Sequence, residues 1–235
     1  MKVLITGAGG FIGNRLANKL LERGTLADKN GQQEKISKIT LLDINFPQAK
    51  DSRLEYVQGD LSDKDLLAKI VDQETTSIFH LASIVSGGAE ADFELGMRVN
   101  LDGTRNLMEV CRMQETQPRF LFSSSVAAFG YGFPPVVEDE TRASPLTSYG
   151  AQKVCCEYLI TDYTRRNFLD GRVLRLPTIS VRPGKPNLAK SSYASGIIRE
   201  PLNGIPTKCP VSPDTGIWIL SPGKIIEALI HAHDL

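Results

Sequence analysis

The first thirteen residues constrain the fold of this chain more than any other stretch. Residues 2–5, KVLI, form a short apolar run that predicts a buried strand. A glycine-rich turn, TGAGGFIG, occupies residues 6–13. From Phe11 to Arg23 the apolar residues recur with helical spacing. A strand, a glycine turn and a helix in this order are typical of proteins that bind a dinucleotide.

Three glycines of this turn have separate expected roles. Gly7 permits a tight turn, Gly10 lets the backbone approach a pyrophosphate, and Gly13 lets helix and strand pack closely. The pyrophosphate would lie on free N–H groups at the positive end of the helix dipole. The spacing differs from the commoner Gly-x-Gly-x-x-Gly, so a plain glycine-rich connection is the alternative.

The composition is typical of a soluble globular protein. A length of 235 residues allows one large domain, or a domain with a small appendage. Lys plus Arg and Asp plus Glu both total 27, so no net field favours nucleic acid or an anionic membrane. We expect neither a membrane span nor a signal peptide. The four cysteines lack metal-ligand spacing, and we expect reduced thiols in a cytoplasmic protein.

Strand-like and helix-like segments alternate along residues 1–176. Further expected strands are 38–43, 54–57, 76–82, 119–125 and 172–176, and further expected helices are 63–71, 93–113 and 146–167. We expect loops at 26–37, which is polar, and at 83–91, which is small and glycine-bearing. This alternation predicts an α/β fold with a doubly wound, parallel Rossmann-type sheet.

The regular alternation of strand-like and helix-like segments ends at Pro177. Prolines interrupt residues 177–215, with one clear helix at 195–202, and we expect this segment to bind substrate. Residues 216–235 are expected to form a return strand and a last helix, with Ser221 as cap and Pro222 at its first position. We therefore expect a dinucleotide-binding domain at 1–176 and a smaller substrate-binding region, the rest of which would follow the last residue.

Acidic residues at strand ends bear on the choice of cofactor. A carboxylate at Asp43 would accept hydrogen bonds from the adenosine ribose and repel a 2′-phosphate, which favours NAD over NADP. An ordinary Asp that begins a turn is the alternative. Arg53 is the nearest later basic residue and could receive a 2′-phosphate, so NAD over NADP is a preference. Asp60 either contacts adenine or caps a turn. We expect His80, within an apolar run, to be packed and hydrogen-bonded rather than catalytic.

A second motif, Tyr149-x-x-x-Lys153, predicts the chemistry. Positions four apart share a helix face, and an ammonium beside a phenol lowers the phenol pKa from about 10. The phenolate would take a hydroxyl proton near neutral pH. Ser125, at a strand end, would orient the same hydroxyl. Tyr-x-x-x-Lys is common by chance, but its place after a strand and a serine run strengthens the hypothesis.

Together these motifs resemble the extended short-chain dehydrogenase/reductase family, or NAD-dependent epimerase/dehydratase family. The matching residues, in order, are Thr6-Gly7-x-x-Gly10-x-x-Gly13, Asp60-Leu61, His80-Leu81-Ala82, Asn100, Ser123-Ser124-Ser125 and Tyr149-x-x-x-Lys153. The resemblance implies that Tyr149 is the acid/base and that Lys153 binds the nicotinamide ribose. It also implies that a serine holds the substrate oxygen, and Ser125 has the best-matching position.

A closer resemblance is to the D-erythronate dehydrogenase group of this family. It rests on the segments 80–87, 90–104, 176–187, 195–202 and 209–213. It implies NAD-dependent oxidation of the C2 hydroxyl of a four-carbon sugar acid. A nucleotide-sugar epimerase with tightly bound NAD and a non-catalytic dinucleotide sensor are the alternatives. Val126 and Ala127 stand where related dehydratases have acids, which argues against dehydration.

The resemblance also implies the residues that line the site. The expected cofactor-binding residues are Gly7, Gly10, Phe11, Ile12, Gly13, Asp43, Asp60, Leu61, Leu81, Ala82, Ser83, Asn100, Tyr149, Lys153 and Pro177. The expected substrate-binding residues are Ser86, Ser125, Arg182 and Asn187, and no metal ligand is expected. A sugar acid needs a cation for its carboxylate, and Arg182 and Lys185 are candidates unless they are solvated loop cations. Family members commonly form dimers through the helices expected at 93–113 and 146–167.

Overall fold

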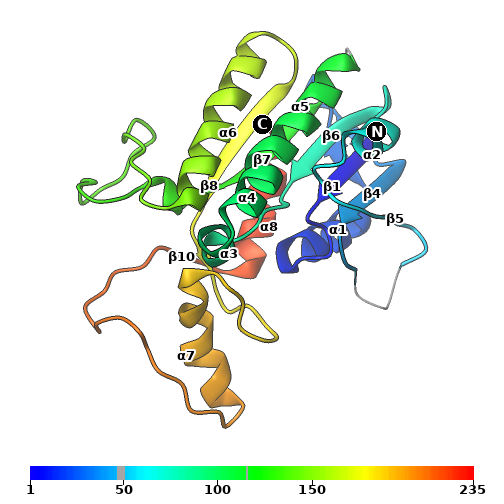
Figure 1. The fold of residues 1–235 in the computed structure, drawn as a ribbon. Helices are drawn as coiled ribbons and strands as arrows, with labels where there is room; N and C mark the ends of the chain where they lie inside the picture. The colour runs from blue at the N-terminus through cyan, green and yellow to red at the C-terminus, as the bar shows by residue number, and fades with distance from the viewer. Residues whose placement is uncertain (47–50, 115) are drawn as a thin grey trace.

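Six parallel strands form the central sheet of the computed structural model, which describes residues 1–46, 51–114 and 116–235. The strands are β1 Lys2–Thr6, β4 Lys38–Asp43, β5 Glu55–Gln58, β6 Thr75–His80, β7 Arg119–Ser125 and β8 Asp170–Leu176. Their order is β5-β4-β1-β6-β7-β8 (Figure 1). The chain runs outward from β1 to β5 and then restarts beside β1 with β6. Ligands of such sheets bind at the carboxyl edge near this switch point.

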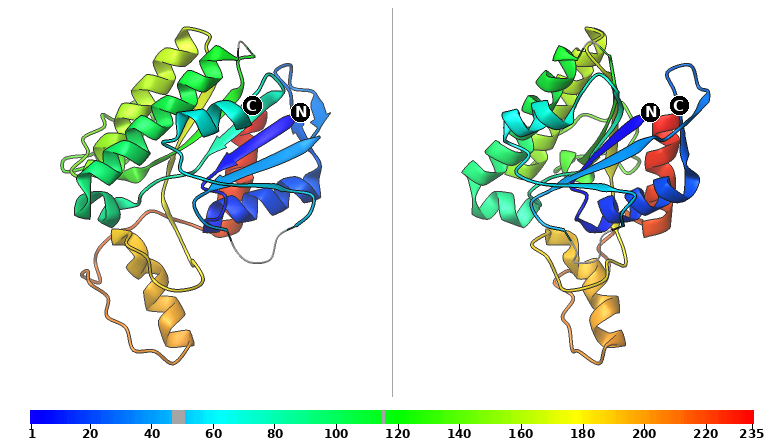
Figure 2. Two further views of the ribbon diagram at one scale, coloured as in Figure 1. Left: turned by 45° about the vertical axis from the view of Figure 1, so that its right-hand side comes forward. Right: turned by 90° about the vertical axis from the view of Figure 1, so that its right-hand side faces the viewer.

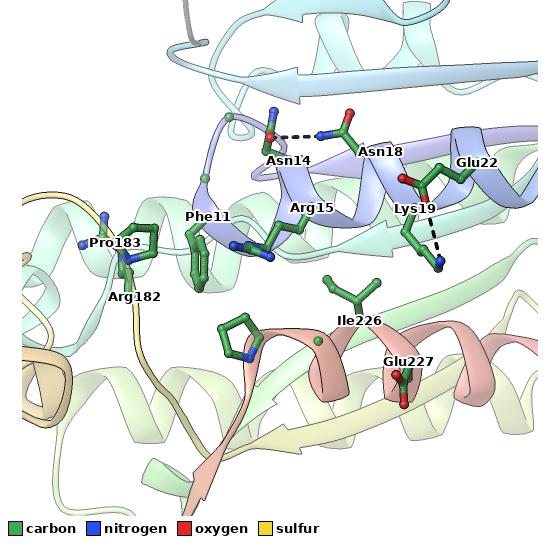
Figure 3. Close-up of a pocket in the computed structure, with 14 residues that line it drawn as sticks. Phe11, Asn14, Arg15, Asn18, Lys19, Glu22, Arg182, Pro183, Ile226 and Glu227 are labelled. Atoms are coloured by element: carbon green, nitrogen blue, oxygen red, sulfur yellow. Dashed lines mark hydrogen bonds and ion pairs between the residues drawn. The ribbon is translucent and has the colours of Figure 1, made fainter. Parts of the chain in front are cut away.

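Helices cover both faces of the sheet (Figure 2). One face carries α1 Phe11–Arg23 and α8 Pro222–Asp234, and the other carries α2 Lys64–Ile70, α5 Thr104–Met113 and α6 Ser148–Arg165. The start of α8 lies beside α1, with Ile226 between them (Figure 3). The structure thus confirms the expected doubly wound α/β fold.

Successive residues of β1 face opposite layers. Val3 and Ile5 pack in one core cluster with Leu16 of α1. Leu4, between them, packs in the other cluster with Leu107 of α5. Side chains alternate along a strand, so a strand covered on both faces must be apolar throughout. This explains the unbroken apolar run at the start of the chain.

Two segments expected as loops contain regular structure. Residues 26–37 overlap a hairpin of β2 Thr25–Ala27 and β3 Gln33–Lys35, which pair in antiparallel fashion. The prediction missed it because β3 is fully exposed and shows no apolar alternation. Residues 83–91 contain α3 Ser86–Ala91, whose two glycines lower its helix propensity. Packing against α6 overrides that propensity.

The helix expected at 93–113 has three parts. These are α4 Phe93–Gly96, the π-helical turn η1 Met97–Gly103, and α5. A π-helical turn adds a residue to the local hydrogen-bonded ring and is most frequent at functional sites. The expected helix is therefore present, but a rare turn interrupts it.

Beyond β8 the chain leaves the sheet (Figure 1). It contains β9 Thr178–Ile179, the 3₁₀ turn η3 Lys190–Ser192, α7 Tyr193–Leu202 and β10 Ile219–Leu220, and β10 pairs with β9. The helix expected at 195–202 and the return strand are thus confirmed. So is the start of α8, because Ser221 Oγ accepts a hydrogen bond from Lys224 N at 3.2 Å.

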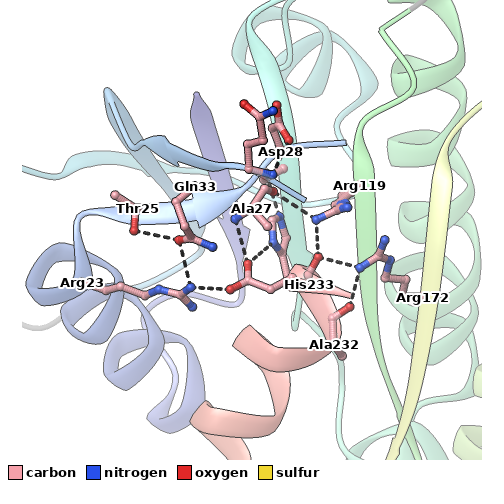
Figure 4. Close-up of polar contacts among 12 residues, drawn as sticks. Arg23, Thr25, Ala27, Asp28, Gln33, Arg119, Arg172, Ala232 and His233 are labelled. Atoms are coloured by element: carbon pink, nitrogen blue, oxygen red, sulfur yellow. Dashed lines mark hydrogen bonds and ion pairs between the residues drawn. The ribbon is translucent and has the colours of Figure 1, made fainter. Parts of the chain in front are cut away.

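The C-terminal end of α8 is fixed to three strands (Figure 4). Arg119 of β7 and Arg172 of β8 each donate a hydrogen bond to His233 O at 2.6 Å. These guanidinium groups satisfy a helix-terminal carbonyl, which lacks a partner within the helix. His233 is fully buried, and its Nε2 lies 2.8 Å from Ser77 Oγ of β6.

We predict that acid destabilises the fold through two buried histidines. Burial lowers the pKa of His233 to about 4 and that of His80 to about 3. Both titrate near 6.5 in the unfolded chain, which therefore binds more protons below that pH. The free energy of unfolding should fall between about pH 6.5 and 4, by up to about 1.4 kcal/mol per pH unit for each histidine.

Urea unfolding at about pH 7.5, 6 and 5 measures this slope. His233→Gln removes one titrating group but retains polar atoms near Ser77, so the slope should fall by about half. An unchanged slope in His233→Gln would contradict this role for the buried imidazole.

Candidate active site

The candidate active site lies at the carboxyl edge of the sheet. Asp43, His80, Ser125 and Leu176 end four of the strands, and the glycine turn follows β1. Two cavities, of about 260 and 470 Å³, open at this edge. We name them after the roles that the sequence predicts for their lining residues, the adenosine cavity and the reaction cavity. A groove of about 820 Å³ lies next to them, between α1 and α8 (Figure 3).

The glycine turn has no space for side chains. Gly7 has a φ of +70°, and a Cβ added to it would lie 2.6 Å from Ala82 N. A Cβ on Gly13 would lie 2.4 Å from Gly7 O. Gly10 is the N-cap of α1 and offers no side chain to the N–H groups of its first turn. Those N–H groups suit an anion, so the turn fits the pyrophosphate of a dinucleotide.

The adenosine cavity brings together six of the expected cofactor-binding residues. They are Gly7, Asp43, Asp60, Leu61, Ala82 and Ser83. Asp43 Oδ2 accepts a hydrogen bond from Gly9 N at 3.0 Å, which fixes the carboxylate. Its Oδ1 accepts a hydrogen bond from Asn45 N at 3.2 Å, so Asp43 also begins a turn, as the alternative interpretation holds. Asp43 lines the cavity, and its contact with a ribose stays a prediction.

Sequence reasoning missed Arg98, which also lines the adenosine cavity. Its Nη1 donates to Asp60 Oδ2 at 2.6 Å and to Ser62 Oγ at 3.0 Å. Burial acts to raise the pKa of Asp60, but hydrogen bonds from Ser62 and Arg98 hold it below its usual value. Asp60 also accepts from Ser62 N at 2.8 Å, so it caps its turn as one alternative proposed.

The reaction cavity collects every expected catalytic and substrate-binding residue. Its walls include Ile12, Leu81, Ser83, Ser86, Ser125, Tyr149, Lys153, Pro177, Arg182 and Asn187. Among the described residues, Lys185 is not part of these walls. Unpredicted polar residues also line the cavity, namely Thr147, Lys190, Ser191, Ser192 and Ser195.

Helix α6 positions the two residues of the Tyr-x-x-x-Lys motif. Thr147 caps the helix, because its Oγ1 accepts a hydrogen bond from Gly150 N at 3.0 Å. Tyr149 therefore lies in the first turn, with Lys153 one turn later. Lys153 Nζ donates to Ser123 O at 2.8 Å and lies 5.6 Å from the centroid of the Tyr149 ring.

Ser125 is poised as a donor beside Tyr149. Its Oγ already accepts a hydrogen bond from Ala127 N at 3.1 Å, so its O–H proton is available to a second partner. A hydrogen bond between Ser125 and Tyr149 is one of two that act to lower the phenol pKa. The two side chains therefore lie together in the wall of the reaction cavity.

The expected lowering of the Tyr149 pKa is wrong for the chain by itself. Burial raises the pKa of Tyr149, and hydrogen bonds with Ser125 and Ser83 offset this only in part. Burial also lowers the pKa of Lys153 to about 8, and the ammonium is bonded to Ser123 O. Ionisation of the phenol near neutral pH therefore needs a further positive charge in the cavity.

His80 has a structural role, as expected. It is fully buried, with Nδ1 2.6 Å from Thr6 Oγ1 and Nε2 2.8 Å from Thr104 Oγ1. Burial depresses its pKa to about 3, so the ring is neutral near pH 7. It joins the end of β6 to β1 and α5.

Asn100 is hydrogen-bonded to the loop that follows β6. It is 2% exposed within η1, and its Oδ1 accepts hydrogen bonds from Ser83 Oγ at 3.0 Å and Ile84 N at 2.7 Å. Its Nδ2 donates to Ile84 O at 3.0 Å and Gln152 Oε1 at 2.8 Å. These bonds use its full capacity, so Asn100 holds the loop after β6 in place.

The remaining expectations concern metals, membranes and thiols. Within the described parts of the chain, no group of three His, Cys, Asp or Glu side chains could hold a metal ion. None of the described helices has the length and apolar character that crossing a bilayer requires. All four cysteines are free, with Cys111 and Cys156 buried and Cys155 and Cys209 exposed.

Comparisons with known proteins agree with this geometry. Residues 3–234 match the profile of the NAD dependent epimerase/dehydratase family. The chain is 57% identical to D-erythronate dehydrogenase of Cupriavidus necator, over the whole chain and 72% of that relative. It is 44% identical to D-erythronate dehydrogenase of Haemophilus influenzae, over the whole chain and 73% of that relative.

A solved structure shares the fold in detail. It is the crystal structure of a nucleoside-diphosphate-sugar epimerase from Agrobacterium tumefaciens, with a TM-score of 0.90 and 42% identity. The alignment covers 99% of this chain and 69% of that one.

We predict that Asp43 selects NAD over NADP. Asp43→Asn keeps the side-chain shape but removes the charge that would repel a 2′-phosphate. The ratio of the two dissociation constants should move toward NADP by about tenfold, which corresponds to about 1.4 kcal/mol. Asp65→Asn, at an exposed carboxylate of α2 outside the cavities, should leave the ratio unchanged. Equal affinities for both nucleotides in the wild type would remove this role from Asp43.

Proposed function

The chain belongs to the NAD dependent epimerase/dehydratase family, and from this premise we propose that it oxidises D-erythronate at C2 to 2-dehydro-D-erythronate. The observation that carries the proposal is that Ser125, Tyr149 and Lys153 line one cavity. Arg182 lines the same cavity. Two relatives named D-erythronate dehydrogenase, similar over the whole chain, support the choice of substrate.

We propose that NAD lies across the carboxyl edge, from the adenosine cavity to the reaction cavity. Asp43 and Asp60 would hold the adenosine, and the turn at 7–13 would hold the pyrophosphate. The remaining contacts would come from Leu61, Leu81, Ala82, Ser83, Pro177, Tyr149 and Lys153, with Asn100 acting through the loop after β6. When bound, NAD supplies a hydride acceptor for the C2 hydrogen and a positive charge near the phenol.

The residues of the reaction cavity would then handle the hydroxyl proton. Tyr149 Oη accepts the proton from the C2 hydroxyl as general base. Ser125 Oγ donates a hydrogen bond to the same substrate oxygen and holds it beside the phenol. Lys153 would stabilise the phenolate and would contact the nicotinamide ribose of bound NAD. Burial raises the pKa of Tyr149 in the free chain, and the positive charge of a bound NAD would act in the opposite direction and favour the phenolate.

We propose that residues 177–215 form the substrate side of the site, and that residues 1–176 hold the cofactor. Arg182 would pair with the carboxylate, and Ser86 and Asn187 would bind hydroxyl groups of the sugar acid. Val126 and Ala127 line the wall next to Ser125 and offer no acid to a leaving hydroxyl. Oxidation therefore suits this cavity better than dehydration.

A nucleotide-sugar epimerase is the second candidate, because of the similar structure from Agrobacterium tumefaciens. An epimerase returns the hydride to its substrate and releases no reduced cofactor. Net formation of NADH when D-erythronate is added to excess NAD supports the dehydrogenase. Interconversion of a nucleotide sugar without net NADH would support the epimerase.

We predict that Tyr149→Phe lowers kcat by about 10²–10⁴, the usual effect of losing a general base. The ring still packs, so the dissociation constant of NAD should change little. Single-turnover formation of NADH, paired with NAD titrations, measures both quantities. In the wild type the rate should rise with pH along one ionisation that lies below the phenol pKa of the free chain.

Two further variants serve as controls for this assignment. Ser125→Ala should lower the rate and spare NAD affinity, whereas Lys153→Met should reduce both. A Tyr149→Phe enzyme that oxidises D-erythronate near the wild-type rate would rule out the phenol as base.

We also propose a symmetric homodimer formed through α5 and α6 with their preceding turns. Phe93, Met113, Leu146 and Tyr158 are each more than half exposed on these segments. A two-fold contact would bury the same patch on both copies. We further propose a cytoplasmic location, which the four free thiols support.

Tyr158→Glu tests the dimer, because it places a charge in the centre of the exposed face of α6. Light scattering at micromolar concentration should give a dimer mass for the wild type and a monomer mass for the variant. Tyr131→Glu changes an exposed tyrosine outside these helices and should remain a dimer. A monomeric wild type would contradict the proposal.

A further inference from the structure

One wall of the reaction cavity is a strap, residues 187–192, that crosses from β9 toward α7 and rests on α3. Leu188 O accepts a hydrogen bond from Gly87 N at 3.0 Å. Ser86 Oγ accepts one from Lys190 N at 3.2 Å. These two bonds join the strap to the first turn of α3, about a hundred residues earlier in the chain. Lys190 is thereby held at the cavity wall.

The contact between strap and α3 is close. A Cβ added to Gly87 would lie 2.0 Å from Leu188 O, which is nearer than any side chain can approach. Only glycine at this position lets the strap lie flat on α3. Gly87 therefore allows the strap to occupy this position against α3.

Among the residues that the structure describes, three cations line the reaction cavity, and two of them have other partners. Lys153 Nζ donates to Ser123 O at 2.8 Å. Arg182 Nη1 donates to Lys185 O at 2.9 Å. Lys190 Nζ has neither a hydrogen bond nor an ion pair with any residue that the structure describes, so its charge is available to a ligand.

Arg182 also lies where it could contact the pyrophosphate of a bound cofactor. It lines the groove between α1 and α8 together with Gly10 and Phe11, as well as the reaction cavity (Figure 3). A guanidinium at that junction would be attracted to the pyrophosphate of bound NAD. Its charge would then be shared between cofactor and substrate, whereas that of Lys190 would not.

We propose that Lys190 binds the carboxylate of the substrate together with Arg182, and that Lys190 makes the site selective for short hydroxy acids over neutral polyols. This inference rests on the proposed function, since it names the residue that distinguishes a sugar acid in that cavity. Ser191 and Ser192, which follow Lys190 on the same wall, supply hydroxyl donors for the remaining substrate oxygens. Lys190 is an exposed residue of this wall, so its ammonium is accessible to a carboxylate that enters the cavity. A hydrogen bond between these two charged groups is stronger than one between neutral groups.

Lys190→Met tests the proposal by separating substrate binding from catalysis. The KM for D-erythronate should rise about tenfold or more, with a smaller change in kcat, because the carboxylate is remote from the reacting hydroxyl. The preference for D-erythronate over erythritol, its neutral polyol counterpart, should fall by a similar factor. The NAD dissociation constant should stay the same, and Lys190→Arg should recover part of the loss.

Three further variants separate the role of Lys190 from other causes of weak substrate binding. Lys208→Met removes an exposed lysine outside the cavity walls and should change none of these quantities. Arg182→Met should weaken both NAD and D-erythronate, in contrast to Lys190→Met. Gly87→Ala keeps Lys190 but displaces the strap, so KM should rise while the thermal midpoint shows that the protein remains folded.

A direct binding measurement distinguishes failure of this inference from failure of the proposed function. Calorimetric titration of D-erythronate into the protein with NADH should show binding by the wild type and weak binding by Lys190→Met. Equal binding and equal KM in the two proteins would overturn the role of Lys190 while leaving the oxidation proposal intact. A wild type that neither binds nor oxidises D-erythronate would overturn both.

Discussion

The whole site depends on the close contact between the glycine turn and the end of β6. Gly7 lies so near the Ala82 backbone that an added Cβ would be 2.6 Å from its nitrogen, and Gly13 lies equally close to Gly7. A side chain at Gly7 would push the turn away from the residues after β6, and a side chain at Gly13 would push α1 away from the turn. Gly7 and Ala82 line the adenosine cavity, whereas Leu81 and Ile12, the chain neighbours of Ala82 and Gly13, line the reaction cavity. Backbone packing at this contact therefore fixes part of the wall of each cavity.

A second constraint fixes α6 to the sheet. Glu157 lies one turn beyond Lys153, accepts hydrogen bonds from Arg175 at 3.0 and 2.7 Å, and also bonds Ser124. Ser124 immediately precedes Ser125 in β7. The contacts of Glu157 therefore fix the position of α6, which carries Tyr149, relative to the strand that carries Ser125. The reacting groups thus come from two elements whose register is locked by buried polar contacts. Catalytic geometry of this kind needs such support, because small displacements reduce the rate strongly.

Much of the fold and site could be predicted because the signals are local. The glycine turn and the Tyr149–Lys153 pair have spacings that directly specify a helix start and a helix face. Lys190 and Arg98 could not be found in this way, because their partners Ser86 and Asp60 lie far away in sequence. The direction of the Tyr149 pKa shift was also missed, since spacing reveals a neighbouring charge but not the extent of burial.

The central claim is that this cavity removes a hydride from C2 of D-erythronate and a proton from its hydroxyl. The most direct test is oxidation of D-erythronate that carries deuterium at C2, followed by analysis of both products. Our account predicts that deuterium accumulates in the reduced dinucleotide, that the organic product lacks it, and that transfer is slower than with hydrogen. Deuterium that stays in or returns to the organic product, with no labelled NADH, would contradict it.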